Sequence, residues 1–487
     1  MKACRYLAGT LRGASRGTEA SLMLRIAATV CAVFSLFPVM APAAVTFTGA
    51  VDPSDPLAWS ADQSATVAGN SNGSIVVDDG NVLHARSVYV ASPEGFTGEI
   101  SVDGGGSRLT ASRVFYLGYG GGEGSLTITN GGSVSVLSWL HVGIGPVATG
   151  RVSVDGVGST LSAGEMWVGT SRGAGTLSIS GGATATGYAT RIGFNRARQG
   201  AVHVVGSGTT LVNAGPITLG EEGSYGTGGG VGALEVSSGA TVQSGLGVIG
   251  FHENTVGVNT AIVDGIGTSW TTDGTMDVGV YGKGRLAITG GATVDCYWGR
   301  VGAYGRSGSG VAIVSGPDSV WACRNGIYVG EGDLQNAGDL SVFQGGLVKS
   351  IIRDRPADSP LLDIKADGMV KMGSGGMLAL EGEAADSLDQ FLELVDGTDD
   401  IRYRDLASGT WQHLSGAAYG TDYTLQYHDA GDLAGFTVLT VTGPIPEPAA
   451  VVLALLGMGC AWLTSYGRRA TSPRSPIDGS YDRTRNE

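Results

Sequence analysis

One short phrase occurs nine times between residues 115 and 330: a mostly apolar residue, a variable residue, then Val, Ile or Leu, then Gly. The copies end at Gly118, Gly143, Gly169, Gly193, Gly220, Gly250, Gly279, Gly302 and Gly330. Successive copies are therefore 23 to 30 residues apart. Such a period is typical of a solenoid, in which one repeat cannot bury its apolar face alone and stacks on its neighbours.

Short alternating runs fill each repeat. Apolar and polar residues alternate at 126–128, 134–136 and 140–142, with Gly-rich corners between them, and the chain holds 84 Gly with only 15% charged residues. Alternation turns every second side chain inward, and Gly supplies the positive φ that corners need. The sequence predicts an all-β fold, a right-handed parallel β-helix of about 26 residues per three-strand coil.

Two kinds of corner alternate along the chain. Val-Asp-Gly occurs at 102–104, 154–156 and 263–265, whereas Leu-x-Ile followed by Gly-Gly occurs from 126, 177 and 286. The full unit is therefore about 50 residues, a length that a four-stranded propeller blade also has. A β-propeller is the second choice, because the two halves of the unit are similar and repeat about every 26 residues. Asp103, Asp155 and Asp264 recur as turn residues rather than as a catalytic set, since an active site is built once.

The variable residue of each phrase points outward, between two inward neighbours. These residues stack into one column on successive coils, which includes Tyr116, His141, Trp167, Arg191, Arg300 and Tyr328. Aromatic and Arg side chains aligned along a sheet can bind a glycan by stacking and hydrogen bonding. The alternative is that they are tolerated surface residues.

Cys296 and Cys323 are the two cysteines between the apolar segments at 26–39 and 449–466. They are 27 positions apart, about one coil, so their Cα atoms fall within the range for a disulfide between neighbouring coils. They lie six and seven residues before the next phrase Gly. The alternative to a disulfide is that this one-residue offset turns the two sulfur atoms to opposite faces of the strand.

The two ends have the composition of targeting segments. Residues 26–39 are apolar, follow Arg25 and precede Ala41-Pro42-Ala43, which predicts a signal peptide over 1–43, with the true start at Met1 or Met23. We expect an N-terminal cap at 44–101, the solenoid at 102–348, a β-rich C-terminal cap at 349–442 and a sorting segment at 443–487.

The sorting segment has three parts in order. Pro446-Glu447-Pro448 precedes residues 449–466, which carry no charge and are long enough for one transmembrane helix, and Arg468 and Arg469 follow. The Arg-rich tail is expected to stay in the cytoplasm, leaving the repeats outside it. This order resembles the PEP-CTERM sorting signal of Gram-negative bacteria. An uncleaved membrane anchor is the alternative, and the tail after Arg469 is longer than is usual for the signal.

The alternating repeat at about 100–350 resembles the repeat shared by type V secretion passengers and PEP-CTERM proteins. The two resemblances together imply processing by an exosortase and delivery from the inner membrane to the cell surface or exopolysaccharide matrix. We expect a structural or adhesive protein without enzymatic activity. A polysaccharide lyase or hydrolase on the same fold is the alternative, and an autotransporter passenger is disfavoured because the C-terminus holds one apolar helix.

Composition excludes several other partners. The net charge of −14 argues against nucleic acid and anionic polymers. The six His are scattered without metal-ligand spacing, and no nucleophile–base arrangement stands out. We therefore expect no metal, no cofactor and no catalytic residue, and exopolysaccharide as the candidate partner.

Overall fold

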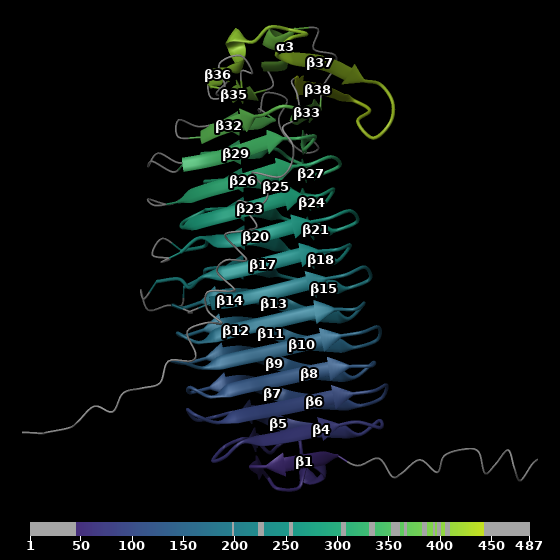
Figure 1. Ribbon diagram of the computed structural model, residues 1–487, viewed down its shortest axis with the longest axis vertical. Coiled ribbons are helices and arrows are strands. Elements are labelled where there is room, and N and C mark those ends of the chain that lie inside the picture. The colour runs from purple at the N-terminus through teal and green to yellow at the C-terminus, as the bar shows by residue number, and fades with distance from the viewer. Residues whose placement is uncertain are drawn as a thin grey trace, which may run out of the picture.

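The computed structural model is a straight rod of stacked strands (Figure 1). It describes residues 45–196, 199–222, 228–252, 257–302, 308–330, 337–351, 361–364, 368–381, 387–392, 395–396, 401–404 and 410–442. The predicted signal peptide, the Pro446-Glu447-Pro448 motif, the segment 449–466 and Arg468 with Arg469 lie outside these residues. No helix in the described ranges is long and apolar enough to cross a membrane.

One long sheet, sheet A, runs the length of the rod with 15 strands. Its strands, in spatial order, are β1 (Thr46–Gly49), β4 (Gly73–Val77), β6 (Thr97–Asp103), β8 (Glu123–Thr129), β10 (Thr149–Asp155), β12 (Ala174–Ser180), β14 (Gln199–Val205), β17 (Gly232–Ser237), β20 (Asn259–Asp264), β23 (Lys283–Thr289), β26 (Ser309–Ser315), β29 (Ala337–Phe343), β32 (Gly368–Met372), β35 (Ile401–Arg404) and β36 (Trp411–His413). Pairing is parallel from β4 to β35 and antiparallel at both ends.

The other strands form sheet B, which bends around the remaining sides of each coil. They are β2 (Val51–Asp52), β3 (Ala65–Val67), β5 (Val82–Val90), β7 (Arg108–Tyr119), β9 (Ser133–Ile144), β11 (Thr160–Thr170), β13 (Thr184–Phe194), β15 (Thr210–Asn213), β16 (Pro216–Leu219), β18 (Thr241–Ser244), β19 (Leu246–Ile249), β21 (Ser269–Thr272), β22 (Thr275–Val278), β24 (Thr293–Cys296), β25 (Trp298–Val301), β27 (Val320–Cys323), β28 (Ile327–Val329), β30 (Leu347–Ser350), β31 (Leu362–Ile364), β33 (Met377–Glu381), β34 (Val395–Asp396), β37 (Tyr423–His428) and β38 (Phe436–Val441).

Each coil has three straight runs. A strand of sheet A is followed by a tight turn and then by a strand of sheet B that bends midway, with a register shift after Ala85 in β5 and after Ala163 in β11. From β15 onward the bend separates two shorter strands, such as β15 and β16. The coils follow each other about every 26 residues, which confirms the expected right-handed parallel solenoid.

The Gly that closes each phrase lies where the chain leaves sheet B. Gly143 has a φ of 73°, and a Cβ on it would lie 1.8 Å from the carbonyl oxygen of Ala174 in a neighbouring coil. The position therefore requires both a left-handed backbone and the absence of a side chain. In β5 the phrase ends in Ala91, which adopts a φ of 55°.

The turns from sheet A to sheet B alternate in kind and link neighbouring coils. The Gly131 N–H of the preceding coil donates to Ser159 Oγ at 3.1 Å, and Ser180 Oγ of the following coil donates to Asp155 Oδ1 at 2.6 Å. Ser107, Thr209, Thr268 and Ser319 hold the same hydroxyl position, and Asp103 and Asp264 hold the same carboxylate position. The expected role of these acids as turn residues is confirmed.

One apolar core fills the rod from Val51 to Val441. Two phrases place Gly, not an apolar residue, at the inward position, and the structure explains both. A Cβ on Gly247 would lie 2.9 Å from a ring carbon of Trp270, and one on Gly299 would lie 3.0 Å from a ring carbon of Trp321. Both Trp side chains are fully buried, so an indole from the next coil shares the space that Gly leaves, with Met276 beside Gly247 and Cys323 beside Gly299.

The parallel coils extend beyond the phrases at both ends. Parallel pairing already joins β4 to β6 and β5 to β7, within 44–101, and it continues to β35, within 349–442. The coils at the ends keep the inward alternation without the phrase. Antiparallel strands then close the rod: β1 covers β4, and the hairpin of β37 and β38 covers β33.

Short helical segments occur near both ends. They are the 3₁₀ turns η2 (Pro56–Ala58) and η4 (Leu414–Gly416) and the helix α3 (Leu388–Leu392). In α3 the buried residues are Phe391 and Leu392, which join the core.

Candidate functional site

The structure places the outward residues of the phrases in one register. Tyr116 pairs with His141, His141 with Trp167, and Trp167 with Arg191. Further along the rod Asp277 pairs with Arg300, which pairs with Tyr328. From β5 to β31 the column is Tyr89, Tyr116, His141, Trp167, Arg191, Thr218, Val248, Asp277, Arg300, Tyr328 and Asp363, and its register continues to Thr66 in β3 and Asp396 in β34.

The first four residues of the column form an aromatic ladder. Tyr89 and Tyr116 are stacked with ring centroids 5.1 Å apart, and Tyr116 and His141 are stacked at 4.9 Å. His141 and Trp167 follow at 5.2 Å with tilted planes. Because the ring faces of Tyr116 and His141 are turned toward their neighbours along the rod, mainly ring edges remain for solvent.

His141 is buried within the ladder, although the sequence places it on the outer side. Its side chain is 8% exposed, and its Nδ1 has no hydrogen-bond partner among the described residues. Burial lowers the pKa of His141 to about 4, so the imidazole is neutral at physiological pH. Large flanking rings cause the burial, since outward side chains of a parallel sheet cover one another.

Arg191 ends the ladder and is held by carboxylates from both neighbouring coils. Its guanidinium carbon lies 5.3 Å from the Trp167 ring centroid, and its Nε donates to Glu165 at 3.2 Å. Its second ion pair is with Glu221, which also accepts a 2.6 Å hydrogen bond from Thr218. Burial alone would lower the pKa of Arg191, but the two carboxylates outweigh it and raise that pKa.

The second half of the column carries two buried acids. Asp277 accepts from Thr275 Oγ1 at 3.0 Å and lies 3.7 Å from Arg300 Nε, whereas Asp363 lies three coils from Asp277. Three strand spacings correspond to about 14 Å, beyond the roughly 5–9.5 Å between the paired carboxylates of most glycosidases. These two acids therefore do not have the spacing of that pair.

Several aromatic residues near the column were not predicted. Tyr89 lies in the sequence Val88-Tyr89-Val90-Ala91, which matches the phrase except that Ala91 replaces the closing Gly. A search that did not require this Gly would have found it. Tyr119 and Phe194 follow the phrase by one residue; Tyr119 contacts the Tyr116 ring and Phe194 the Trp167 ring. Trp139 comes two residues before His141 and shares its outward side by simple alternation.

Cys296 and Cys323 are paired in register on adjacent coils, and both point into the core. The one-residue offset is taken up after each Cys, between β24 and β25 and between β27 and β28, and so it does not change their direction. The thiols are free, with the two Sγ atoms 3.1 Å apart. Burial raises the pKa of the Cys323 thiol well above its usual value.

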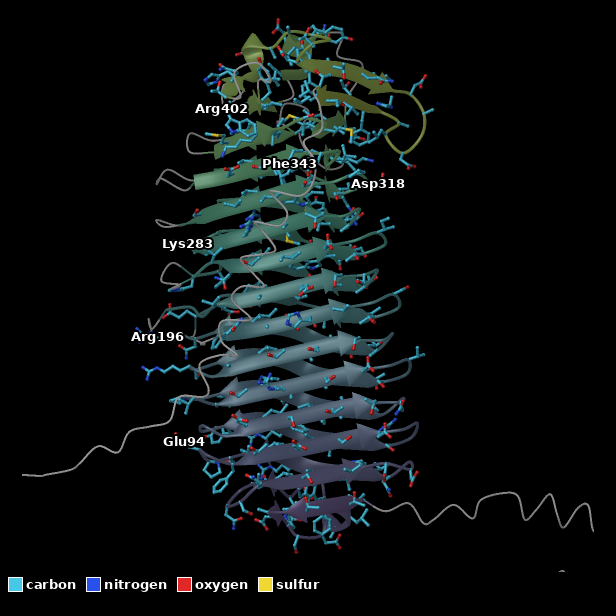
Figure 2. All side chains as sticks on the ribbon, viewed as in Figure 1. Glu94, Arg196, Lys283, Asp318, Phe343 and Arg402 are labelled. Atoms are coloured by element: carbon cyan, nitrogen blue, oxygen red, sulfur yellow. The ribbon has the colours of Figure 1, made fainter. Side chains whose placement is uncertain are left out.

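Charged loops lie along one side of the rod, where the chain passes from sheet B to sheet A. Figure 2 shows Glu94, Arg196 and Lys283 on that side and Asp318 on the opposite one. Within the described ranges no group of three or more His, Cys, Asp or Glu side chains is placed to hold a metal ion.

The fold and the column define a parallel β-solenoid protein. No family model and no curated protein matches the chain. One solved structure is similar, the crystal structure of a TibC-catalysed hyper-glycosylated TibA55-350 fragment, with 17% identity and a TM-score of 0.29. The match covers 65% of this chain and 90% of that one. At this identity and TM-score, the likeness supports no functional conclusion.

Proposed function

We propose that the chain is an exported structural or adhesive solenoid of a Gram-negative bacterium, sorted by residues 443–487 to the cell envelope or the exopolysaccharide matrix. The observation that carries this proposal is the uninterrupted stack of parallel coils around one core, closed by antiparallel strands at both ends. Such a rod presents long lateral faces for contact, and the edge strands at its ends, β1, β36 and β37, are short, with 4, 3 and 6 residues.

The proposed route begins with a signal peptide and a temporary anchor in the inner membrane. An exosortase then recognises Pro446-Glu447-Pro448 and releases the body from the segment 449–466. Exopolysaccharide is the proposed partner, contacted by the aromatic and Arg residues in and around the column, including Tyr116, Trp167 and Tyr328. Two features of the body support an uncharged partner: the acidic net charge and the carboxylates that already neutralise Arg191.

Cell fractionation tests the route. A tag placed after residue 43 should be found at the cell surface or in the matrix, and replacing Pro446, Glu447 and Pro448 with Ala should retain the protein in the inner membrane. An unchanged distribution of this variant would refute sorting by the motif. Incubation with the host exopolysaccharide separates binding from catalysis: co-sedimentation without shortening of the polymer is expected, and the release of new reducing ends would identify an enzyme instead.

A further inference from the structure

Large side chains also recur at the bend of sheet B, beside the column. The register that holds Trp139 passes through Ala189, so Tyr188 lies one residue before it. We name Trp139, Tyr188, Leu246 and Trp298 the corner strip. Trp139 is 45% exposed, Tyr188 59% and Leu246 39%, while Trp298 is half-buried against Tyr328. They belong to β9, β13, β19 and β25, each two coils beyond the one before, because β11, β16 and β22 lie between them.

The coil after Tyr188 and the coil after Leu246 have Gly at the bend, so these two side chains lie over the backbone of the next coil. We call the four side chains of the strip outcrops. A Cβ on Gly215 would lie 3.0 Å from Cζ of the Tyr188 ring, and a Cβ on Gly274 would lie 2.5 Å from Cδ2 of Leu246. The Tyr188 ring thus rests on the backbone of the next coil, with much of its surface open to solvent. Unlike the rings of the ladder, it offers a surface rather than an edge.

The bend is also nearly free of charge. The residues at the bend from β9 to β25 are 137–139, 163–165, 187–189, 214–216, 244–246, 273–275 and 296–298, and the charged residues among them are Glu165 and the exposed Asp273. Glu165 pairs with Arg191 and also accepts from Trp167 Nε1 at 2.9 Å. An uncharged apolar strip on an acidic protein suits an uncharged partner and disfavours an anionic one.

The spacing of the strip suggests the shape of that partner. Two coils correspond to about 9.6 Å, and the strip from Trp139 to Trp298 to about 29 Å. In an extended β-1,4-linked glycan each sugar advances by about 5 Å, close to one strand spacing. Successive sugars alternate in orientation, so the same apolar ring face recurs at every second sugar, with the period of the strip.

We propose that the corner strip binds an uncharged, extended β-1,4-linked glycan lengthwise, with every second sugar on an outcrop. This proposal rests on the proposed function and specifies its ligand class. An α-linked glycan that coils does not follow a straight row of platforms, and a short oligosaccharide that reaches one outcrop gains nothing from the next.

Pull-down of the full chain in mild detergent tests the strip. We expect the protein to sediment with cellulose or chitin and not with starch. The double variant Trp139→Ala/Tyr188→Ala should lose about tenfold or more in affinity. Tyr188→Phe keeps the ring and should bind like the wild type. Val157→Ser/Ile266→Ser removes two more exposed apolar side chains from the opposite turn and should also leave binding unchanged.

Oligosaccharide length gives an independent test. A β-1,4 hexasaccharide reaches three residues of the strip and should bind at least about tenfold more tightly than the disaccharide, which reaches one. Equal binding of starch and cellulose, full retention by the double variant, or equal affinity for both lengths would overturn the proposal. Retention on the host exopolysaccharide would then still support the proposed function. Failure to bind any polysaccharide, including that one, would overturn both.

Discussion

His141 should make the rod less stable in mild acid. It is neutral in the folded chain, where its pKa is about 4 against an ordinary value of 6.5. Below pH 6.5 the unfolded chain therefore binds a proton that the folded chain does not, and stability falls until the pH reaches about 4. The lower pKa corresponds to about 3 kcal/mol in total, most of which is lost by pH 4.5.

Urea unfolding at pH 7.5 and 4.5, followed by tryptophan fluorescence, measures this loss. Carboxylates also titrate in this range, so the same experiment on His141→Phe is the control; Phe keeps a ring between Tyr116 and Trp167 but takes up no proton. The wild type should lose roughly 2–3 kcal/mol more than the variant between the two pH values. Equal losses, or an imidazole pKa above 6 measured by NMR, would refute the burial argument.

Three further predictions concern the core. Trp321→Ala should cost about 3–5 kcal/mol because it leaves a cavity; a change below about 1 kcal/mol in the urea midpoint analysis would contradict this packing. Gly143→Ala should destabilise the rod far more than Gly120→Ala, because both have positive φ but only Gly143 faces backbone within 4 Å; similar melting temperatures would argue against that close approach. Cys296 and Cys323 should resist mild oxidants in the folded protein, since burial keeps the Cys323 thiol protonated, whereas rapid loss of both thiols by mass spectrometry would show access to this part of the core.

The phrase was sufficient to predict the coil, because its period and its alternation are local properties of the chain. Local alternation also placed Trp167 and Arg191 in one register. Alternation did not show that neighbouring rings stack face to face, because stacking depends on the side-chain directions in three successive coils. The same limit applies to Gly247, which breaks the apolar pattern and makes sense only beside Trp270 of the next coil.

Tyr188 illustrates a different limit. It lies at the bend, outside the phrase, where sequence alternation is interrupted and no period marks a residue as exposed. Its neighbour Gly215 is equally uninformative alone, one glycine among 84. Only the stacking of the coils brings the two together and lays the ring across the backbone.

The alternating turns constrain how a rod of this kind can change length. Ser159 accepts from the coil before it and Asp155 from the coil after it, so a coil of this kind is bonded to a turn of another kind on both sides. Insertion or loss of a single coil here would place two Ser/Asp turns in contact and leave hydroxyl, carboxylate or backbone groups without their partners, whereas two Gly-Gly turns do lie in contact at 345–346 and 375–376. Duplication within the gene is therefore expected to proceed by pairs of coils, lengthening the rod in steps of about 9.6 Å and adding one corner outcrop at each step.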